Sequence, residues 1–318
     1  MTNQPLGSRR APRNMAASVR SRLTALAHAQ GQETEYILTR YALERLLYRI
    51  TRSSFSDDFI LKGALLFALW DERARRPTRD LDLLGFGSDS PERVEHIFRD
   101  LCALAVEDDG LVFAPESVRA NPIREAQEYG GVRVTLQATL GSARLRVQVD
   151  IGFGDVITPS PQEVIFPTLL SLPAPVARAY PRETVVAEKV EALTHLGLTN
   201  TRMKDFYDLW LLARLFSFDG LILATAIATT FTRRRTPLPE AEPLALTDVF
   251  AHDPGKSAEW RAFILRSRLD SPGLILPSVV EVLRAFLLPP LSAIRLGKAY
   301  DDQLWPPGGP WKNQAESG

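Results

Sequence analysis

The sequence reads Lys62-Gly63-Ala64 and, a short segment later, Arg76-Pro77-Thr78-Arg79-Asp80-Leu81-Asp82-Leu83. Alternate side chains of a strand point to the same face, so Asp80 and Asp82 would lie together, roughly 6 to 7 Å apart along the backbone. The leucines between and after them indicate a partly buried strand, where two carboxylates without a cation would be costly. The pair is therefore a candidate site for a divalent metal ion.

The first of these two segments has the character of a phosphate-binding turn. Gly63 precedes a predicted helix from Ala64 to about Arg73. Such a turn presents backbone N–H groups and the positive end of the helix dipole to a phosphate. Together, the turn and the acidic strand predict a nucleoside triphosphate held against Mg²⁺. Two acidic residues on a strand are common and usually solvated, however, so other motifs are needed to support this interpretation.

A third carboxylate lies in a predicted β-hairpin, whose strands 132–140 and 143–151 flank Gly141-Ser142. Apolar and polar residues alternate along its second strand, which puts Asp150 at the end of the polar face. A two-metal site requires a third carboxylate on a strand beside the acidic one. The pattern leaves two alternatives open: Asp150 completes such a set, or it only ends a strand before a glycine turn.

Two later segments carry charged residues on predicted helices. Lys189 lies at the edge of an apolar helical stripe, where a lysine commonly extends its ammonium group to solvent. Asp205 and Asp208 are three residues apart and therefore neighbours on one helix face. Carboxylates in a first helical turn are commonly partners of the helix dipole, without a catalytic role.

The order of turn, helix and acidic strand resembles the nucleotidyltransferase superfamily, whose members share a DNA-polymerase-β-like palm. More narrowly, four blocks resemble the AbiEii/AbiGii toxin family of type IV toxin–antitoxin systems, and the resemblance runs from about Ser18 to about Phe216. The blocks are Phe59–Phe67, Arg76–Asp82, Glu188–Leu193 and Arg202–Leu209. One departure is Ala64, where the superfamily often has serine or glycine, which removes one hydroxyl contact but leaves the backbone donors.

This resemblance implies an α+β fold: a polymerase-β-like palm with a mixed sheet, a helical preface before it and a helical domain after it. It implies metal binding by Asp80, Asp82 and Asp150, with Asp155 as the substitute for Asp150. It also implies that Lys189 serves the nucleotide and that Asp205 or Asp208 positions Lys189 or the acceptor. The other expected nucleotide contacts are Lys62, Gly63, Ala64, Thr78 and Arg79, although Arg79 could equally be a structural counter-ion.

The function implied by the resemblance is transfer of nucleotides from an NTP to an RNA acceptor, dependent on Mg²⁺ or Mn²⁺. The tRNA 3′ acceptor end is the acceptor known in the family, and its modification would block translation. The protein would be the toxin of a bacterial toxin–antitoxin or phage-defence system with a cognate antitoxin. The alternatives are nucleotidylation of a protein or a small molecule, and a non-catalytic protein that binds nucleotide or RNA.

Composition sets broader limits on the chain of 318 residues. The single cysteine, Cys102, excludes an internal disulfide, and the four histidines lack the spacing of zinc ligands. Positive and negative side chains balance at 38 each, although arginines cluster within residues 9–22 and at 233–235. Such clusters are usually solvated, but in a nucleotidyltransferase they could contact an RNA backbone. We expect a cytoplasmic protein that acts as a monomer and has no membrane-spanning segment.

The expected organisation follows from changes in composition along the chain. Residues 1–13 are expected to form a disordered basic tail, and residues 14–165 the helical preface and palm. A proline-rich connection leads to a helical domain over residues 176–300, and residues 301–318 are expected to form a disordered tail. The predicted helices of the second half cover residues 181–196, 203–216, 219–232, 258–268 and 276–295.

Overall fold

The computed structural model describes residues 14–70, 78–123, 130–269 and 273–314. The basic segment 1–13 therefore lies outside the described residues. The α-helices are α1 (Met15–Ala29), α2 (Thr34–Arg52), α3 (Phe67–Trp70), α4 (Pro91–Ala103), α5 (Arg182–Leu196), α6 (Met203–Leu215), α7 (Gly220–Arg233), α8 (Asp248–Ala251), α9 (Pro254–Ser267) and α10 (Leu276–Arg295). Short 3₁₀ turns cover Ser56–Asp58, Gly63–Leu66, Gly197–Thr199 and Leu244–Leu246.

The strands are β1 (Phe59–Lys62), β2 (Asp80–Gly85), β3 (Leu111–Ile123), β4 (Gly131–Leu140), β5 (Ala143–Phe153), β6 (Gln162–Ile165), β7 (Val176–Ala179), β8 (Phe218–Asp219), β9 (Gln303–Trp305) and β10 (Lys312–Asn313). The first seven form a mixed sheet in the order β3-β4-β5-β2-β1-β7-β6, and the last three form a small sheet. The α+β class with a mixed sheet is thus confirmed.

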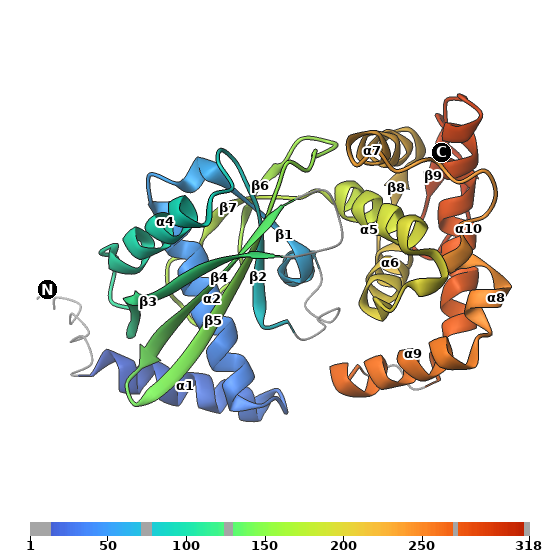
Figure 1. The fold of residues 1–318 in the computed structure, drawn as a ribbon. Coiled ribbons are helices and arrows are strands. Elements are labelled where there is room, and N and C mark those ends of the chain that lie inside the picture. The colour runs from blue at the N-terminus through green and yellow to red at the C-terminus, as the bar shows by residue number, and fades with distance from the viewer. Residues whose placement is uncertain (1–13, 71–77, 124–129, 270–272, 315–318) are drawn as a thin grey trace, which may run out of the picture. The chain divides into compact units, whose positions relative to one another are not determined.

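The chain divides into two compact units that are interleaved along the sequence. The sheet unit contains the described residues within 1–59, 78–153 and 164–177. The helical unit contains those within 60–77, 154–163 and 178–318. Figure 1 labels the elements of both units, and each unit is described separately below.

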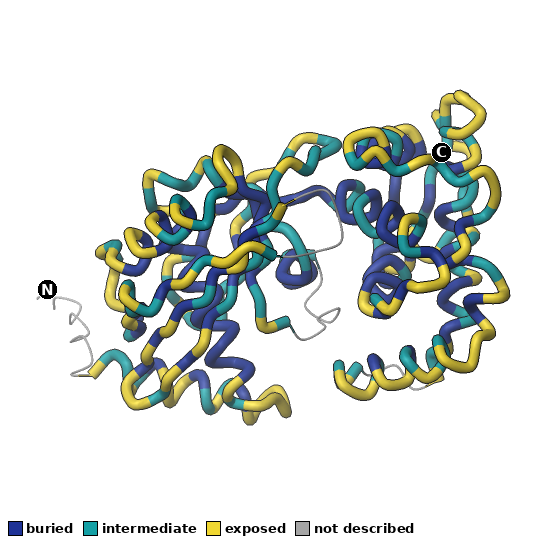
Figure 2. The backbone as a smooth tube through the Cα atoms, in the orientation of Figure 1, coloured by how far each residue is buried: buried dark blue, intermediate teal, exposed yellow. Residues whose placement is uncertain are grey.

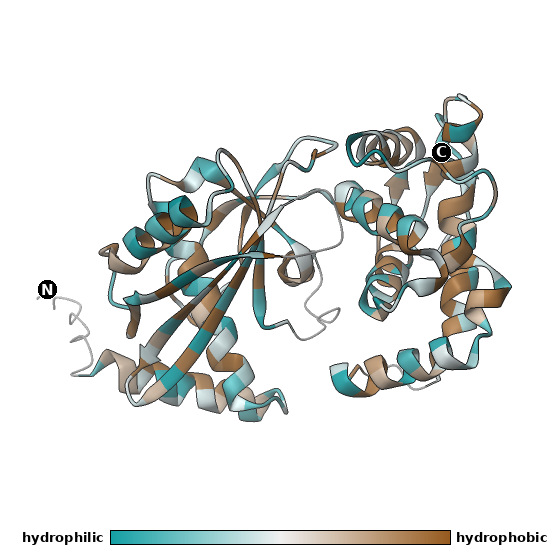
Figure 3. Cartoon of the chain, viewed as in Figure 1, coloured by the Kyte–Doolittle hydropathy of each residue, from teal (hydrophilic) through white to brown (hydrophobic). Residues whose placement is uncertain are grey.

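The sheet unit is built on the predicted hairpin. Strands β4 and β5 are antiparallel from Leu140↔Ala143 to Gly131↔Gly152, and Gly141 adopts the positive φ of 59° that its turn requires. Strand β2 adds to β5 in parallel. One face of these strands is apolar and buried, and Figures 2 and 3 show the alternation of buried, apolar positions with exposed, polar ones along them. The predicted alternation of β5 is confirmed.

Helices of the sheet unit contact this sheet, and two of them begin with a capping side chain. Helix α2 contacts β5, while α4 contacts β3 and β4. The Asn14 side chain accepts a hydrogen bond from Ala17 N at the start of α1, at 3.0 Å. Ser90 accepts one from Arg93 N at the start of α4, at 3.1 Å, with Pro91 as its first residue. Cys102 on α4 is buried, as expected, and burial raises the pKa of its thiol to about 12.

The helical unit packs its core from α5, α6, α7 and α10. Helix α5 contacts both α6 and α7, and α10 contacts α6 and α7. The predicted helices of this half are present, with ends that differ by a few residues. Among the described residues, α10 alone is long and apolar enough to cross a membrane, which differs from the sequence expectation that no segment is. Val279, Val280 and Leu283 of α10 are nevertheless fully buried, as in the core helix of a folded domain.

The C-terminal segment is ordered through Gln314, so the expected disordered tail over residues 301–318 is wrong for its described part. Strand β9 pairs with both β8 and β10. Trp305 is 1 % exposed, and its indole donates a hydrogen bond to Ala213 O at 2.7 Å. Proline and glycine in this segment suggested disorder, but the segment buries Trp305 and partly buries Trp311, whose rings lie 5.6 Å apart.

The predicted helix from Ala64 to about Arg73 is also different in the structure. A 3₁₀ turn over Gly63–Leu66 leads into α3, which covers only Phe67–Trp70, and residues 71–73 lie outside the described ones. Ala64, Leu65 and Leu66 are all buried. These three consecutive side chains are buried together, which is the pattern of a core segment and not of one amphipathic helical stripe.

Candidate active site

Three carboxylates lie together on the polar face of the sheet unit. Asp80 and Asp82 alternate along β2, as predicted, and both are partly buried. Asp82 is the register partner of Asp150 on the parallel strand β5. Register partners point to the same face, so Asp80, Asp82 and Asp150 belong to one surface on two neighbouring strands. The structure therefore brings the three predicted metal ligands onto one face.

Asp150 is held by an arginine from the other neighbouring strand. Arg133 on β4 donates from Nε and Nη2 to the two Asp150 oxygens, at 2.8 and 2.7 Å. This two-point geometry is the strong form of an arginine–carboxylate pair. Among the described residues, no group of three or more His, Cys, Asp or Glu side chains is arranged to hold a metal ion. The donor types suit Mg²⁺ or Mn²⁺, and Arg133 would compete with a cation for the Asp150 oxygens.

Thr78 and Arg79 precede the acidic strand but differ in their contacts. The Thr78 hydroxyl lies 3.5 Å from Asp80 N and 3.4 Å from Asp80 O, so it contacts the backbone at the start of β2. The Arg79 side chain is 62 % exposed and lies 3.8 Å from a Glu33 oxygen. In the structure, Arg79 therefore has the contact of a surface counter-ion. Arg76 and Pro77 of the same motif lie outside the described residues.

In the helical unit, Lys62 ends β1 directly before the Gly63 turn. Gly63 has a φ of 73°, a conformation that other residues rarely adopt. Lys62 Nζ lies 3.0 Å from an Asp155 oxygen and 3.2 Å from Glu188. Burial alone would lower the pKa of Lys62, but the Glu188 and Asp155 carboxylates raise it well above its usual value. Lys62 is therefore a charged residue whose side chain is only 17 % exposed.

The carboxylate pair around Lys62 includes Asp155, the predicted substitute for Asp150. Asp155 also accepts two hydrogen bonds from Arg234, at 3.1 and 2.9 Å. Burial opposes ionisation of Asp155, but Lys62 and Arg234 outweigh it and hold its pKa well below the usual range. Burial raises the pKa of Glu188, although Lys62 partly offsets the effect. With two cations on its oxygens, Asp155 has the environment of a structural ion pair.

This cluster contains residues that sequence reasoning missed or assigned to another role. Arg234 also donates to Glu191 at 2.8 Å and is only 13 % exposed, so it is not available to an RNA backbone as its place in the Arg233–Arg235 cluster suggested. Glu188 and Glu191 are three apart on α5 and face the cluster together. The sequence alone shows the spacing of Glu188 and Glu191. Their partners Lys62, at the end of β1, and Arg234, directly after α7, are brought to them only by the tertiary fold.

Lys189 on α5 is enclosed by the two aspartates of the later motif. Its ammonium lies 2.5 Å from Asp205 and 2.9 Å from Asp208, both on α6. Asp205 and Asp208 are 5 % and 1 % exposed. Burial opposes ionisation of Asp205, yet Lys189 and Arg202 lower its pKa below the usual value. The structure thus places both predicted aspartates on Lys189, instead of leaving Lys189 directed to solvent.

Comparison with known proteins assigns the chain to the nucleotidyl transferases. The family model that matches is the nucleotidyl transferase AbiEii toxin of Type IV toxin–antitoxin systems, over residues 45–285. The chain therefore belongs to the AbiEii toxin family, as the sequence motifs predicted, and membership implies a cognate antitoxin.

Solved structures similar to this chain include two from Helicobacter pylori. One is JHP933, with 14 % identity and a TM-score of 0.45, where the match covers 80 % of this chain and 92 % of that one. The other is a proposed nucleotidyltransferase, with 13 % identity and a TM-score of 0.48, where the match covers 82 % of this chain and 97 % of that one. A search among curated protein sequences finds no match.

Proposed function

We propose that this AbiEii toxin transfers nucleotides from an NTP to the 3′ end of tRNA and thereby blocks translation. The observation that carries the proposal is the common face of Asp80, Asp82 and Asp150 on two paired strands. In a member of a nucleotidyl transferase family, such a face has the donor groups for a polymerase-β-like palm.

In this proposal, Asp80 and Asp82 would hold a divalent cation, Mg²⁺ or Mn²⁺, and Asp150 would be the third ligand, in competition with Arg133. The cation would supply charge neutralisation at the triphosphate and a lower pKa of the attacking hydroxyl. The RNA 3′ hydroxyl forms a bond to the α-phosphorus, the bond from that phosphorus to the β-phosphate oxygen breaks, and pyrophosphate leaves. The hydroxyl proton passes to solvent.

The helical unit contributes the second part of the proposal. Lys189 serves the nucleotide with its ammonium group, and Asp205 and Asp208 hold that group in one position through bonds of 2.5 and 2.9 Å. A fixed cation is suited to stabilise negative charge on a leaving pyrophosphate. Lys62 and the Gly63 turn are proposed as a further nucleotide contact. The protein would act in the cytoplasm as a monomer, where a cognate antitoxin restrains it.

The proposal is tested by a transfer assay with mixed acceptors, in which the labelled product shows which acceptor is modified. Purified protein is incubated with each α-labelled NTP, Mg²⁺, and a mixture of deacylated total tRNA and cell protein. Label should enter tRNA, depend on the divalent ion and be abolished by a chelator. Label in protein with none in RNA would replace this function by protein nucleotidylation, and no labelled product with any NTP would favour a non-catalytic binding protein.

A further inference from the structure

The polar face that carries the three carboxylates continues along β5 as a basic surface. Arg144 and Arg146 occupy alternate positions of β5 and share a face with Gln148 and Asp150. Asp150 lies six positions after Arg144, which is roughly 20 Å along a strand. A polyanion bound along this face could therefore extend from the carboxylates to Arg144 without leaving the sheet.

The strand registers arrange this surface in rows across the sheet. Asp82, Asp150 and Arg133 form one row, and the next contains Asp80, Gln148, Thr135 and Arg119. The following rows pair Arg146 with Gln137 and Arg144 with Thr139. Of these four rows, only the first two contain carboxylates, whereas each row contains an arginine.

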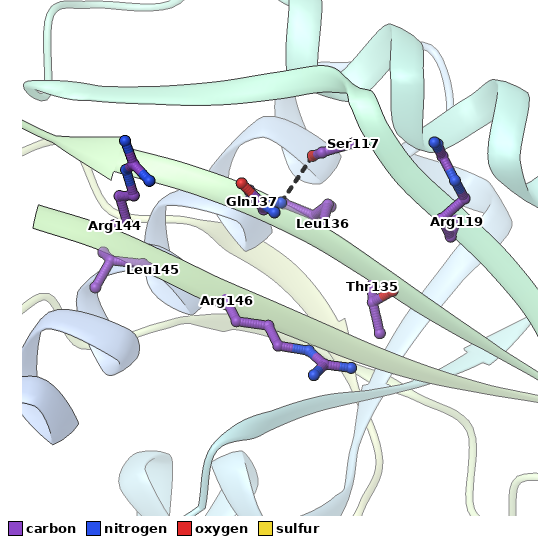
Figure 4. Close-up of a pocket in the computed structure, with 8 residues that line it drawn as sticks. All are labelled: Ser117, Arg119, Thr135, Leu136, Gln137, Arg144, Leu145 and Arg146. Atoms are coloured by element: carbon purple, nitrogen blue, oxygen red, sulfur yellow. Dashed lines mark hydrogen bonds between the residues drawn. The ribbon is translucent and has the colours of Figure 1, made fainter.

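A depression of about 600 Å³ lies on this face, and Figure 4 shows its lining. The lining residues are Ser117, Arg119, Thr135, Leu136, Gln137, Arg144, Leu145 and Arg146. They include three arginines and no carboxylate. Ser117 is fixed by a hydrogen bond from Gln137 N at 2.8 Å, and Arg119 donates to Glu116 O at 2.8 Å. The edge of the depression is therefore held by β3.

Arg144 and Arg146 are exposed on this surface. Within the part of the chain that the structure describes, neither forms an ion pair with a carboxylate. They contrast with Arg133, which binds Asp150, and with Arg234, which is buried among acidic side chains. Guanidinium groups favour phosphate oxygens, to which they can donate two parallel hydrogen bonds.

We propose that Arg144, Arg146 and Arg119 bind the phosphate backbone of the acceptor RNA behind the 3′ end that reacts at Asp80 and Asp82. This inference rests on the proposed function and adds the surface that holds the acceptor. The spacing of two residues on a strand is on the order of the separation between successive phosphates. An RNA fits better than an acidic protein, because six of the eight lining side chains are polar and none is an aromatic anchor of the kind found in protein interfaces.

The experiment measures binding of 5′-labelled, deacylated total tRNA by fluorescence anisotropy at several salt concentrations, without NTP. The variant R144Q/R146Q is compared with wild type and with R261Q/R266Q, which removes two exposed arginines from α9. Each phosphate contact contributes about 0.7 to 0.9 to the salt slope, so R144Q/R146Q should flatten it by roughly 1.4 to 1.8 units. The control variant should keep the wild-type slope.

Metal-dependent binding of labelled NTP is measured in parallel and should be equal in all three proteins. Wild-type slope and affinity in R144Q/R146Q would overturn the assignment of this surface while leaving the proposed function intact. A variant that still binds tRNA normally but no longer binds its antitoxin would likewise overturn it, in favour of a protein interface. A wild-type protein without tRNA affinity would overturn both the surface and the RNA-directed function.

Discussion

Lys189 illustrates how little one residue's sequence neighbourhood says about its environment. Its position at the edge of an apolar stripe is typical of a lysine that extends to solvent. In the structure its side chain is only 16 % exposed and lies between Asp205 and Asp208. The motif resemblance identified the three residues together, but only the packing of α5 against α6 explains their contact.

We predict that Lys189→Met lowers stability and abolishes transfer. Loss of the ammonium leaves two buried carboxylates without their cation, which should cost about 3 to 5 kcal/mol of unfolding free energy. The triple variant with Asp205→Asn and Asp208→Asn should regain most of this stability but remain inactive. Denaturant unfolding and transfer rates across NTP concentrations measure the two effects. Recovery of transfer by the triple variant would show that Lys189 has only a structural role.

The arrangement of the strand carboxylates could be predicted from the sequence more fully than the environment of Lys189. Alternation along β2 and β5 follows from the period of a strand, so the common face of Asp80 and Asp82 needed no tertiary information. The hydrogen bonds from Arg133 to Asp150 did require tertiary information, because the register of β4 against β5 decides which side chains are opposite each other. That register follows from the Gly141-Ser142 turn, which the sequence did indicate.

At the scale of elements, local patterns predicted helices with caps better than segments stabilised by distant contacts. Asn14 and Ser90 cap α1 and α4 as their positions indicated. The C-terminal strands were missed because their proline and glycine content is typical of disordered tails. Trp305 packs 4.9 Å from the ring of Phe286 on α10, a contact that no local pattern reveals.

We predict that Trp305→Ala destabilises the protein by about 3 to 5 kcal/mol, because it removes a buried aromatic side chain and leaves Ala213 O without its indole donor. The control is Leu296→Ala, whose side chain is 60 % exposed and should change stability by no more than about 0.5 kcal/mol. Thermal and denaturant unfolding provide the comparison. Equal stability of the two variants would mean that β9 does not contribute to the core of the helical unit.

At the scale of the whole molecule, positive and negative side chains are equal in number but unevenly distributed. Arg133 and Arg234 are bound to carboxylates, whereas Arg144 and Arg146 remain exposed on the sheet. The sequence pattern singled out the arginine cluster at 233–235 as a possible RNA contact. In the structure, the middle residue of this cluster is only 13 % exposed. The interleaving of two units was equally inaccessible, since it depends on which distant segments pack together.

The most direct test of the central claim is the rate of nucleotide transfer to tRNA by Asp80→Asn and Asp82→Asn at saturating Mg²⁺. These nearly isosteric changes remove one ligand charge each while preserving side-chain volume, and circular dichroism and thermal unfolding verify the fold. The proposed metal role predicts loss of transfer by at least about a hundredfold in each variant, equivalent to about 2.7 kcal/mol in the barrier. Glu92→Gln, an exposed carboxylate at the start of α4, should transfer at the wild-type rate. Wild-type transfer by folded Asp80→Asn and Asp82→Asn would contradict the assignment of the active site to this face.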